Sequence, residues 1–449
     1  YICGNPPYVG ATVKPPKDAD EASKSRMKEE AEARKADLER LFAGLTTKWK
    51  SLDYVSGWFL KAVQYGQHTA STAALVTTNS ICQGQQVAIL WPIIFRLGAE
   101  IEFAHTNFKW TNLAKNKAGV TCVIVGLGRS GRPNRTLYSV SDSGEPMSQE
   151  VENINAYLIA GANIEVQSRR TPPTGRMSIE AGGKPVEGGY LLLSMQEKNQ
   201  LLLEVPEASH VIKRVFGANE HAKGLVRFAL WFHDDDLDLI AKHSALASRV
   251  EGVRKMRLDS PKDATIASAN MPHKFQEVKQ SGDEIVTLIP TLTAEKREYI
   301  PASLEPAGTI ITNLAFGQFD GPLSDLAIIA SRIHFVWIAA ICGKFKTDYR
   351  YSNTLGWNTF PVPKLTEQNK ADLTRCAEDI LLAREAHFPA TIADLYDPET
   401  MPENLRHAHD RNDEVLERIY IGRRFKNDTE RLEKLFDLYT KMTGGKAAA

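Results

Sequence analysis

The residues with the clearest chemistry stand near the start of the chain, where a short apolar run ends in Asn5-Pro6-Pro7-Tyr8. The two prolines fix the backbone φ angle and carry no N–H, so the loop is stiff and its carbonyl oxygens are free to accept hydrogen bonds. Asn5 adds an amide oxygen, and Tyr8 adds a flat ring that can stack on another ring. This arrangement suits a planar amine, such as the amino group of a nucleobase. The plain alternative is a Pro-Pro turn after a strand.

Three other polar stretches resemble known sites, but their neighbouring residues argue against a binding role. The stretch GLGRSG (126–131) follows a predicted strand and has the spacing of a dinucleotide-binding loop, or of the cofactor loop of a permuted methyltransferase. Pro133 stands where a phosphate-facing helix should run, so we expect a glycine-rich exit loop. The acidic stretch HDDDLDL (233–239) precedes an amphipathic pattern, where Asp residues cap a helix. GGKP (182–185) lacks the hydroxyl residue of a phosphate-binding loop, and we predict no metal site.

Composition limits the function classes. The chain has 449 residues, which predicts two or three domains, and its 55 basic residues equal its 55 acidic residues. No overall charge therefore attracts the chain to nucleic acid or membrane, and any DNA contact must come from local patches. The five cysteines are far apart and form no CxxC, which indicates neither a zinc site nor a disulfide framework. No apolar stretch approaches the roughly 18 residues of a membrane span, so we expect a cytoplasmic protein with no membrane partner.

The elements that must position Asn5 to Tyr8 alternate between helices and strands, which is typical of an α/β sheet domain. The chain begins with Tyr inside an apparent strand, which suggests a piece of a longer protein. Apolar spacing predicts helices over 38–45, 55–63 and 84–98, the last interrupted by Pro92, and strands over 73–79, 101–105 and 120–127.

The texture of the sequence changes after this section. From about residue 131, short apolar runs are broken by Gly, Pro and charged residues, which predicts a mixed, loop-rich domain. From about residue 366 the helical spacing returns, and Asn427 with Glu430 has the pattern of a capping box.

Several stretches, taken in order, resemble one enzyme family. GNPPYVG (4–10) resembles motif IV of the N6-adenine DNA methyltransferases. Further stretches resemble the type IIL, MmeI-like restriction–modification methyltransferases, and the resemblance covers nearly the whole chain. These stretches are LDYVSGWFLKAVQY (52–65), ALVTTNSICQGQQV (74–87), FAHTNFKWTNLAKNKAGVTCVIVGL (103–127), INAYLIAGANIEVQSRR (154–170), GGYLLLS (188–194), KREYIPAS (296–303), YRYSNTLGWNTFPVP (349–363) and LYDPETMPENLRHAHD (395–410).

The resemblance implies a fold and a division into domains. The expected fold class is α/β: the C-terminal half of a Rossmann-like class I methyltransferase sheet, then a mixed α+β target-recognition domain and a helical C-terminal domain. The expected ranges are 1–130 for the partial catalytic domain, 131–365 for target recognition and 366–449 for the helical domain.

The resemblance also implies a reaction, the S-adenosylmethionine-dependent methylation of adenine N6 in double-stranded DNA, with the target base swung out of the duplex. By resemblance, the Asn5 amide oxygen and the Pro6 carbonyl accept the two N6 hydrogens on a ledge stiffened by Pro7. Tyr8 stacks on the base, and Phe108 or Trp110 supplies a second ring from the other side.

Members of this family carry a nuclease domain, a helical connector and the main cofactor motif before motif IV. We therefore expect the partner of this chain to be the missing N-terminal region of the same protein. Alone, the chain is expected to bind the cofactor weakly or not at all and to be inactive.

DNA contacts are expected from basic loops in the recognition domain. Arg169 and Arg170 precede two prolines, and two further stretches mix Arg, Tyr and Ser, the residue types that contact phosphates and base edges. The expected DNA-binding residues are Arg169, Arg170, Arg297, Tyr299, Arg350 and Ser352.

Two other functions remain open from the sequence. The chain could be a DNA sequence-specificity module without catalysis of its own. It could also belong to a methyltransferase that acts on RNA or on a protein glutamine, since motif IV types recur there.

Overall fold

A six-stranded mixed sheet forms the first part of the molecule. The computed structural model describes residues 1–8, 18–69, 71–110, 120–129, 131, 134–140, 145–345 and 347–444, with only the backbone at 109, 110 and 120. The strands of the sheet are, in spatial order, β1 (Ile2–Gly4), β2 (Ala73–Thr78), β4 (Val120–Arg129), β3 (Ala99–Trp110), β5 (Arg135–Val140) and β6 (Pro146–Val151). β1 runs parallel to β2, with Ile2 beside Ala73, whereas β4 is antiparallel to both of its neighbours.

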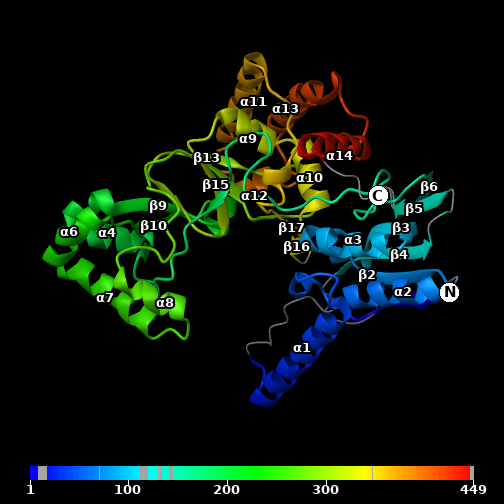
Figure 1. The fold of residues 1–449 in the computed structure, drawn as a ribbon. Coiled ribbons are helices and arrows are strands. Elements are labelled where there is room, and N and C mark those ends of the chain that lie inside the picture. The colour runs from blue at the N-terminus through cyan, green and yellow to red at the C-terminus, as the bar shows by residue number, and fades with distance from the viewer. Residues whose placement is uncertain are drawn as a thin grey trace.

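Two helices, α2 (Ser56–His68) and α3 (Val87–Arg96), pack on this sheet (Figure 1). Residues of β2 alternate between buried and half-buried, so one face of the strand is covered more completely than the other. The sequence predicts that Pro92 interrupts the helix over 84–98. This prediction is wrong, because α3 continues through Pro92. Proline removes one backbone donor, and the buried Leu90, Trp91 and Ile94 around it hold the helix in place.

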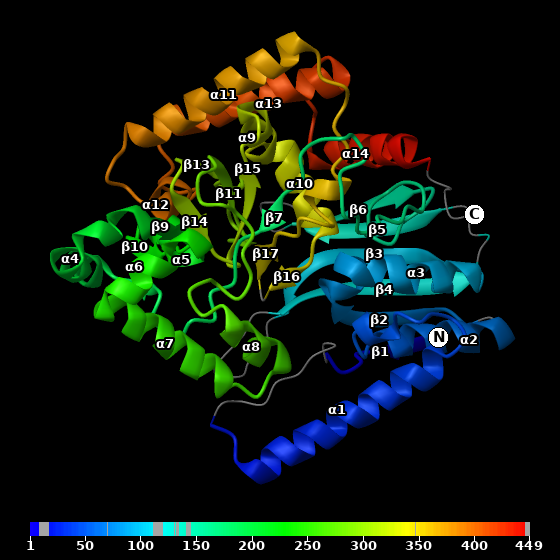
Figure 2. The same cartoon turned by 60° about the vertical axis from the view of Figure 1, so that its left-hand side comes forward.

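Helix α1 (Glu21–Phe42) projects from the sheet as an arm (Figure 2). It begins where the Asp20 carboxylate accepts a hydrogen bond from Ser23 N at 2.7 Å. Only Leu38 and Phe42 near its C-terminal end are buried, and they join the core beside α2.

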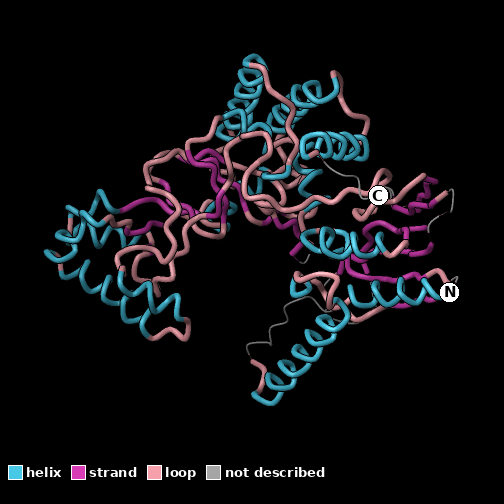
Figure 3. Tube along the Cα trace, viewed as in Figure 1, coloured by secondary structure: helices cyan, strands magenta, loops and turns pink. Residues whose placement is uncertain are grey.

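The middle of the chain is rich in loops, as Figure 3 shows. Two four-stranded sheets and one three-stranded sheet lie within it, in spatial orders β14-β9-β10-β8, β13-β11-β15-β7 and β12-β17-β16. The strands are β7 (Glu180–Ala181), β8 (Leu192–Leu193), β9 (Ile212–Phe216), β10 (Arg227–Leu230), β11 (Val286–Pro290), β12 (Leu292–Thr293), β13 (Ser303–Glu305), β14 (Thr309–Ile311), β15 (Ala315–Phe319), β16 (Lys344–Phe345) and β17 (Asp348–Arg350). The helices are α4 (Met195–Glu204), α5 (Ala218–Lys223), α6 (Leu237–Lys242), α7 (Ser244–Leu258), α8 (Asp263–Ala267), α9 (Leu323–Ile329) and α10 (Arg332–Ile341).

The acidic stretch before α6 caps a short turn and not the helix that the sequence predicts, because Asp236 at the N-cap of α6 makes no side-chain bond to that helix. Asp234–Asp236 forms a short 3-10 turn in which the Asp236 carboxylate accepts a hydrogen bond from His233 N at 2.7 Å. Asp234 pairs with Lys274 at 2.7 Å. Among the described residues, no group of His, Cys, Asp or Glu side chains is arranged to hold a metal ion.

The C-terminal part is helical: α11 (Glu367–Glu385), α12 (Ile392–Leu395), α13 (Glu403–Ile421) and α14 (Asp428–Thr443). Asn427 caps α14, because its side chain accepts from Glu430 N at 2.9 Å. The Glu430 carboxylate accepts from Lys426 N at 2.6 Å, one residue before the position that a capping box requires, so the predicted box is only half formed.

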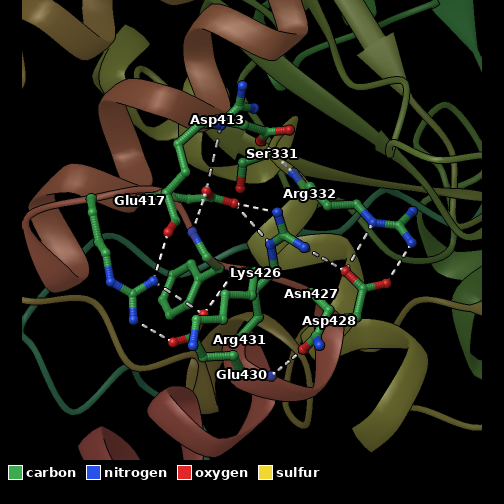
Figure 4. A network of polar contacts seen from close by, with 12 residues as sticks. Ser331, Arg332, Asp413, Glu417, Lys426, Asn427, Asp428, Glu430 and Arg431 are labelled. Carbon is green, nitrogen blue, oxygen red and sulfur yellow. Dashed lines mark hydrogen bonds and ion pairs between the residues drawn. The ribbon is translucent and has the colours of Figure 1, made fainter.

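A polar network ties α13 and α14 to the N-terminus of α10 (Figure 4). Arg332 donates to both carboxylate oxygens of Asp428, at 3.3 and 2.6 Å, and its backbone N donates to Asp413 at 2.7 Å. Asp428 also pairs with Arg431 at 2.8 Å, and Arg431 reaches the buried Glu417. One apolar cluster continues from the first sheet through α9 and α10 to these helices.

In the described part of the chain, no single helix is long and apolar enough to cross a membrane. The consecutive helices α9 and α10 reach the required length and composition only when taken together, with a bend of 59° between them.

Candidate catalytic edge and DNA-reading loops

The ledge Asn5–Tyr8 lies at the carboxyl end of β1, beside the carboxyl end of the parallel strand β2. Open α/β sheets bind ligands outside the carboxyl ends of their strands. Pro6 is buried and anchors the ledge, whereas Asn5 is exposed. No other described residue forms a hydrogen bond with the Asn5 side chain, so its amide oxygen is available to a ligand.

The Tyr8 hydroxyl is buried beside the Cys122 thiol, without a partner of good hydrogen-bond geometry. Burial, and then the neighbouring thiol, raise the pKa of Tyr8 well above its usual value, so the hydroxyl stays protonated. On the sheet, Cys122 pairs with Phe108 of β3. Tyr8 and Phe108 therefore flank one residue, although they are distant in sequence.

Phe108 owes its position to an irregularity of β3. The register shifts between His105 and Phe108, so one more residue lies on β3 than on β4 over this stretch. The His105 ring meets the edge of Phe108 with centroids 5.1 Å apart. Trp110 ends the strand, and its side chain lies outside the described residues.

A hydrogen-bonded cluster that the sequence did not single out supports this edge. The Asp53 carboxylate accepts from Ser80 Oγ at 2.7 Å and from Gln86 Nε2 at 2.6 Å. The Gln86 amide oxygen accepts in turn from Asp53 N at 2.9 Å. The segment after β2 is therefore held in one conformation beside the ledge. The only sequence signal was a run of polar residues, TTNS (77–80), across the end of the strand.

Four of the predicted DNA-binding residues lie on two segments that touch. Arg169 N donates to the Thr354 carbonyl at 2.8 Å, and the Asn358 side chain donates to the carbonyls of Arg169 and Arg170 at 3.0 and 2.9 Å. Arg350 and Ser352 stand just before Thr354 in the second segment.

The side chains of these four residues differ in their surroundings. Arg170 and Arg350 are exposed, whereas the Arg169 guanidinium lies beside the Tyr439 hydroxyl. The Ser352 hydroxyl accepts from Leu355 N at 3.2 Å and so stabilises its own turn.

The other two predicted residues have less free surface. Arg297 is half-buried, and this burial lowers the pKa of its guanidinium. Tyr299 is 5% exposed; its ring stacks on His409 and its hydroxyl donates to Asp413 at 3.1 Å. Described residues thus surround Tyr299, and the proposed DNA-binding set does not include it.

The described residues of the glycine-rich stretch, 126–129 and 131, do not form a phosphate-binding loop. Gly126 and Gly128 lie inside β4, and a Cβ atom on them would approach the Phe103 ring to 2.2 Å and the Glu102 carboxylate to 1.9 Å. These glycines make room for side chains of the neighbouring strand. The exit loop that the sequence predicts over 126–131 is therefore wrong for 126–129, which belong to the strand.

Arg257, at the end of α7, has a structural role. Its five guanidinium N–H groups donate to five backbone carbonyls at 2.7 to 3.3 Å, and the residue is fully buried. The acceptors belong to Pro185, Val186, Ser268, Met271 and Lys274.

Known proteins resemble this chain over its whole length. Models of the MmeI DNA-methyltransferase domain, target recognition domain and C-terminal domain match residues 1–139, 160–364 and 365–446. A Bacillus subtilis (strain 168) protein named DNA methyltransferase A is 36% identical over 444 residues, which are 99% of this chain and 48% of that protein. The type IIL restriction–modification enzyme MmeI, solved in complex with DNA, matches with a TM-score of 0.85 at 33% identity, over 99% of this chain and 57% of that chain. The chain thus spans about half the length of these relatives.

Proposed function

Because the chain belongs to the MmeI family, with the DNA-methyltransferase, target recognition and C-terminal domains of that family in this order, we propose that it serves to methylate the N6 amine of adenine at a specific site in duplex DNA. The observation that carries this proposal is the exposed Asn5 amide at the carboxyl end of β1, to which no other described residue bonds, with Tyr8 and Phe108 beside Cys122.

The ledge acts on the amine through two oxygen acceptors. The lone pair of an adenine amine is delocalised into the ring, which makes the nitrogen a poor nucleophile. The Asn5 amide oxygen and the Pro6 carbonyl accept its two hydrogens and favour the pyramidal nitrogen, whose lone pair then points away from the ring. Because these acceptors fit the transition state better than the planar ground state, they lower the barrier. Tyr8, with Phe108 or Trp110 opposite, holds the plane of a base that has left the duplex.

The proposed methyl donor is S-adenosylmethionine, which supplies an electrophilic sulfonium methyl group when bound. The ledge suits the reacting end of such a donor. The candidate for a glycine-rich loop that leads into a helix was the stretch around Gly126 and Gly128, but these glycines lie within β4. No other described residues form such a loop. We place the main cofactor pocket in the region of the relatives that this chain does not cover. Isothermal titration of the 449 residues with S-adenosylmethionine should show no micromolar binding, and micromolar binding would contradict this placement.

Double-stranded DNA is the proposed partner, bound in the cytoplasm. The exposed Arg170 and Arg350 are the best placed for phosphates, with Ser352 and the half-buried Arg169 and Arg297 nearby. Phosphate contacts fix the register of the protein on the duplex, and a few contacts to base edges read the sequence.

Methylome sequencing of a host that expresses the full-length reading frame tests the proposed function. We expect N6-methyladenine at one sequence motif, and its loss in the Asn5→Ala variant. Duplex binding by that variant should stay within about twofold, because Asn5 touches the extruded base rather than the backbone. The matched control is Asn199→Ala, on the exposed surface of α4 far from the ledge (Figure 1).

The same experiment separates the competing functions. Specific duplex binding without any methylated motif would favour a DNA sequence-specificity module. Methylation of RNA or of protein glutamine, with unmodified DNA, would favour the other methyltransferase class. Either result would overturn the proposal.

A further inference from the structure

A side-chain amide connects the catalytic edge to the target recognition domain. Gln83 lies in the segment between β2 and α3 and is 7% exposed. Its amide oxygen accepts from Asn79 Nδ2 at 3.2 Å, and its amide nitrogen donates to the Ala339 carbonyl of α10 at 3.1 Å. We propose that Gln83 is a positioning residue, which fixes the ledge relative to the hairpin β16–β17, where the predicted DNA contact Arg350 lies, so that the base extruded at the recognised site meets Asn5. This inference rests on the proposed function.

On the catalytic side, the anchor of Gln83 is rigid. Asn79 is the first residue after β2, the strand that pairs with β1 and therefore with the start of the ledge. The next residue, Ser80, is bonded to Asp53, as described above. Movement of Gln83 would therefore require movement of the edge itself.

On the recognition side, Gln83 meets the end of a helix. The last carbonyls of a helix have no partner within it, and Ala339 lies in the last turn of α10. Gln83 satisfies that carbonyl from another domain. Its amide has only one favourable orientation, because the flipped group would set oxygen against oxygen and N–H against N–H.

The hairpin β16–β17 is fixed to α10 and moves with it. The Tyr349 ring meets the Phe335 ring at 5.3 Å, and Arg350 N donates to the Gly343 carbonyl at 2.9 Å. Lys344 pairs with Glu295 at 2.9 Å. Arg350, a predicted DNA contact, is the last residue of this hairpin, and Figures 1 and 2 both show the hairpin beside the end of the first sheet.

Packing alone does not fill the junction between the two parts. A cleft of about 270 Å³ lies there, and its wall includes Gln83, Thr106 and Asn107 on one side and Arg332, Ala339 and Tyr349 on the other. Backbone also approaches backbone nearby, since a Cβ on Gly84 would lie 3.9 Å from Gly343 N. Beside this cleft, the buried amide of Gln83 adds a directional contact to the apolar cluster that joins the two parts.

The consequence for the reaction follows from geometry. The recognition loops choose the register on the duplex, whereas the ledge requires the amine within hydrogen-bond reach of Asn5 and Pro6. A displacement of about 1 Å between reacting groups can cost about 100-fold in rate. Loss of the Gln83 tie should therefore slow methyl transfer while leaving recognition of the site intact.

The test compares Gln83→Met, Gln83→Glu and the control Gln85→Met in the full-length protein. Met keeps the length of the side chain without hydrogen bonds, and Glu keeps the acceptor for Asn79 but sets a carboxylate against the Ala339 carbonyl. Gln85 is exposed two residues away. Duplex Kd, single-turnover methylation at saturating DNA, and hydrogen–deuterium exchange over residues 339–352 are measured for each.

We expect both Gln83 variants to methylate about 10- to 100-fold more slowly, with Kd within about twofold of the wild type and of Gln85→Met. Amide exchange should rise at the end of α10 and in the hairpin. A rate equal to that of Gln85→Met, a loss of affinity that matches the loss of rate, or unchanged exchange would overturn the inference. A wild-type protein that methylates no DNA would refute the proposed function. In that case the amide exchange of the Gln83 variants would still decide whether Gln83 fixes the junction.

Discussion

Replacing Asp413 by Asn should make the free energy of unfolding less sensitive to a rise in pH from about 5 to about 8. Asp413 lies on α13 and is 4% exposed, and its carboxylate accepts from Arg332 N and from the Tyr299 hydroxyl. Neither of these donors is a charged group. Burial, and then the nearby Glu417, raise the pKa of Asp413 to about 7, although Arg431 and the two donors oppose the shift.

The sign of the effect follows from the direction of this shift. A carboxyl group with a raised pKa contributes stability that is fully present below its unfolded pKa of 3.8 and is lost as the pH rises through about 7. Between about pH 5 and about pH 8, such a group removes about 2–3 kcal/mol from the free energy of unfolding. Asparagine loses no proton, and its amide can accept from Arg332 N while donating to the Tyr299 oxygen.

Urea unfolding, followed by tryptophan fluorescence at both pH values, measures the difference between wild type and Asp413→Asn. Burial lowers the pKa values of His221 and His334, so their contribution to the free energy of unfolding rises with pH. Both histidines occur in both proteins, so this contribution cancels in the comparison. Asp437→Asn, at an exposed position on α14, is the control. If the free energies of wild type and Asp413→Asn change in parallel from about pH 5 to about pH 8, the reasoning on the buried carboxyl is refuted.

Three further results are expected. Arg257→Lys should lower the free energy of unfolding by about 2–4 kcal/mol, because three ammonium donors cannot satisfy five carbonyls, whereas the exposed Arg254→Lys should change it little; equal effects would contradict the structural role. Gly126→Ala should lower the free energy of unfolding by about 1–3 kcal/mol, because its Cβ would clash with the Phe103 ring. Gly66→Ala within α2 should raise it by about 0.5–1 kcal/mol, and urea unfolding measures both. A stabilising Gly126→Ala would contradict the clash and show that the strands can separate. Arg350→Ala should weaken duplex binding and reduce the slope of log K against log salt by about 1, and an unchanged slope would mean that Arg350 neutralises no phosphate.

The sequence-based predictions succeeded where the signal is local. The family and the fold class are confirmed, and the order of strands and helices around Asn5 follows from apolar spacing and from the prolines. The roles of Asn5, Tyr8 and Phe108 and the domain limits at 130 and 365 stay predictions. β3 extends beyond its predicted end at 105 to Trp110, because pairing with β4 carries the strand through Asn107 and Lys109, whose own strand propensity is weak.

Contacts between distant residues could not be predicted. Tyr299 has the composition of a DNA contact, but its partner Asp413 follows 114 residues later, and only the packing of α13 reveals that the tyrosine is buried. Gln83 meets a carbonyl 256 residues away, and a backbone acceptor leaves no mark on side-chain identity. Arg257 likewise binds carbonyls, so its charge in the sequence suggests a surface role that the fold does not give it.

The apolar cluster that runs without a break from the first sheet to α14 limits how specificity can be transplanted. A graft of residues 160–364 alone into a relative would leave Arg332 facing a foreign helix in place of Asp428, and Tyr299 facing a foreign residue in place of Asp413. The natural unit of exchange is therefore the recognition segment together with the two helices that brace it, α13 and α14. Chimeras cut at residue 364 would need matching partners for Arg332 and Tyr299 on these two helices, however well their loops were chosen.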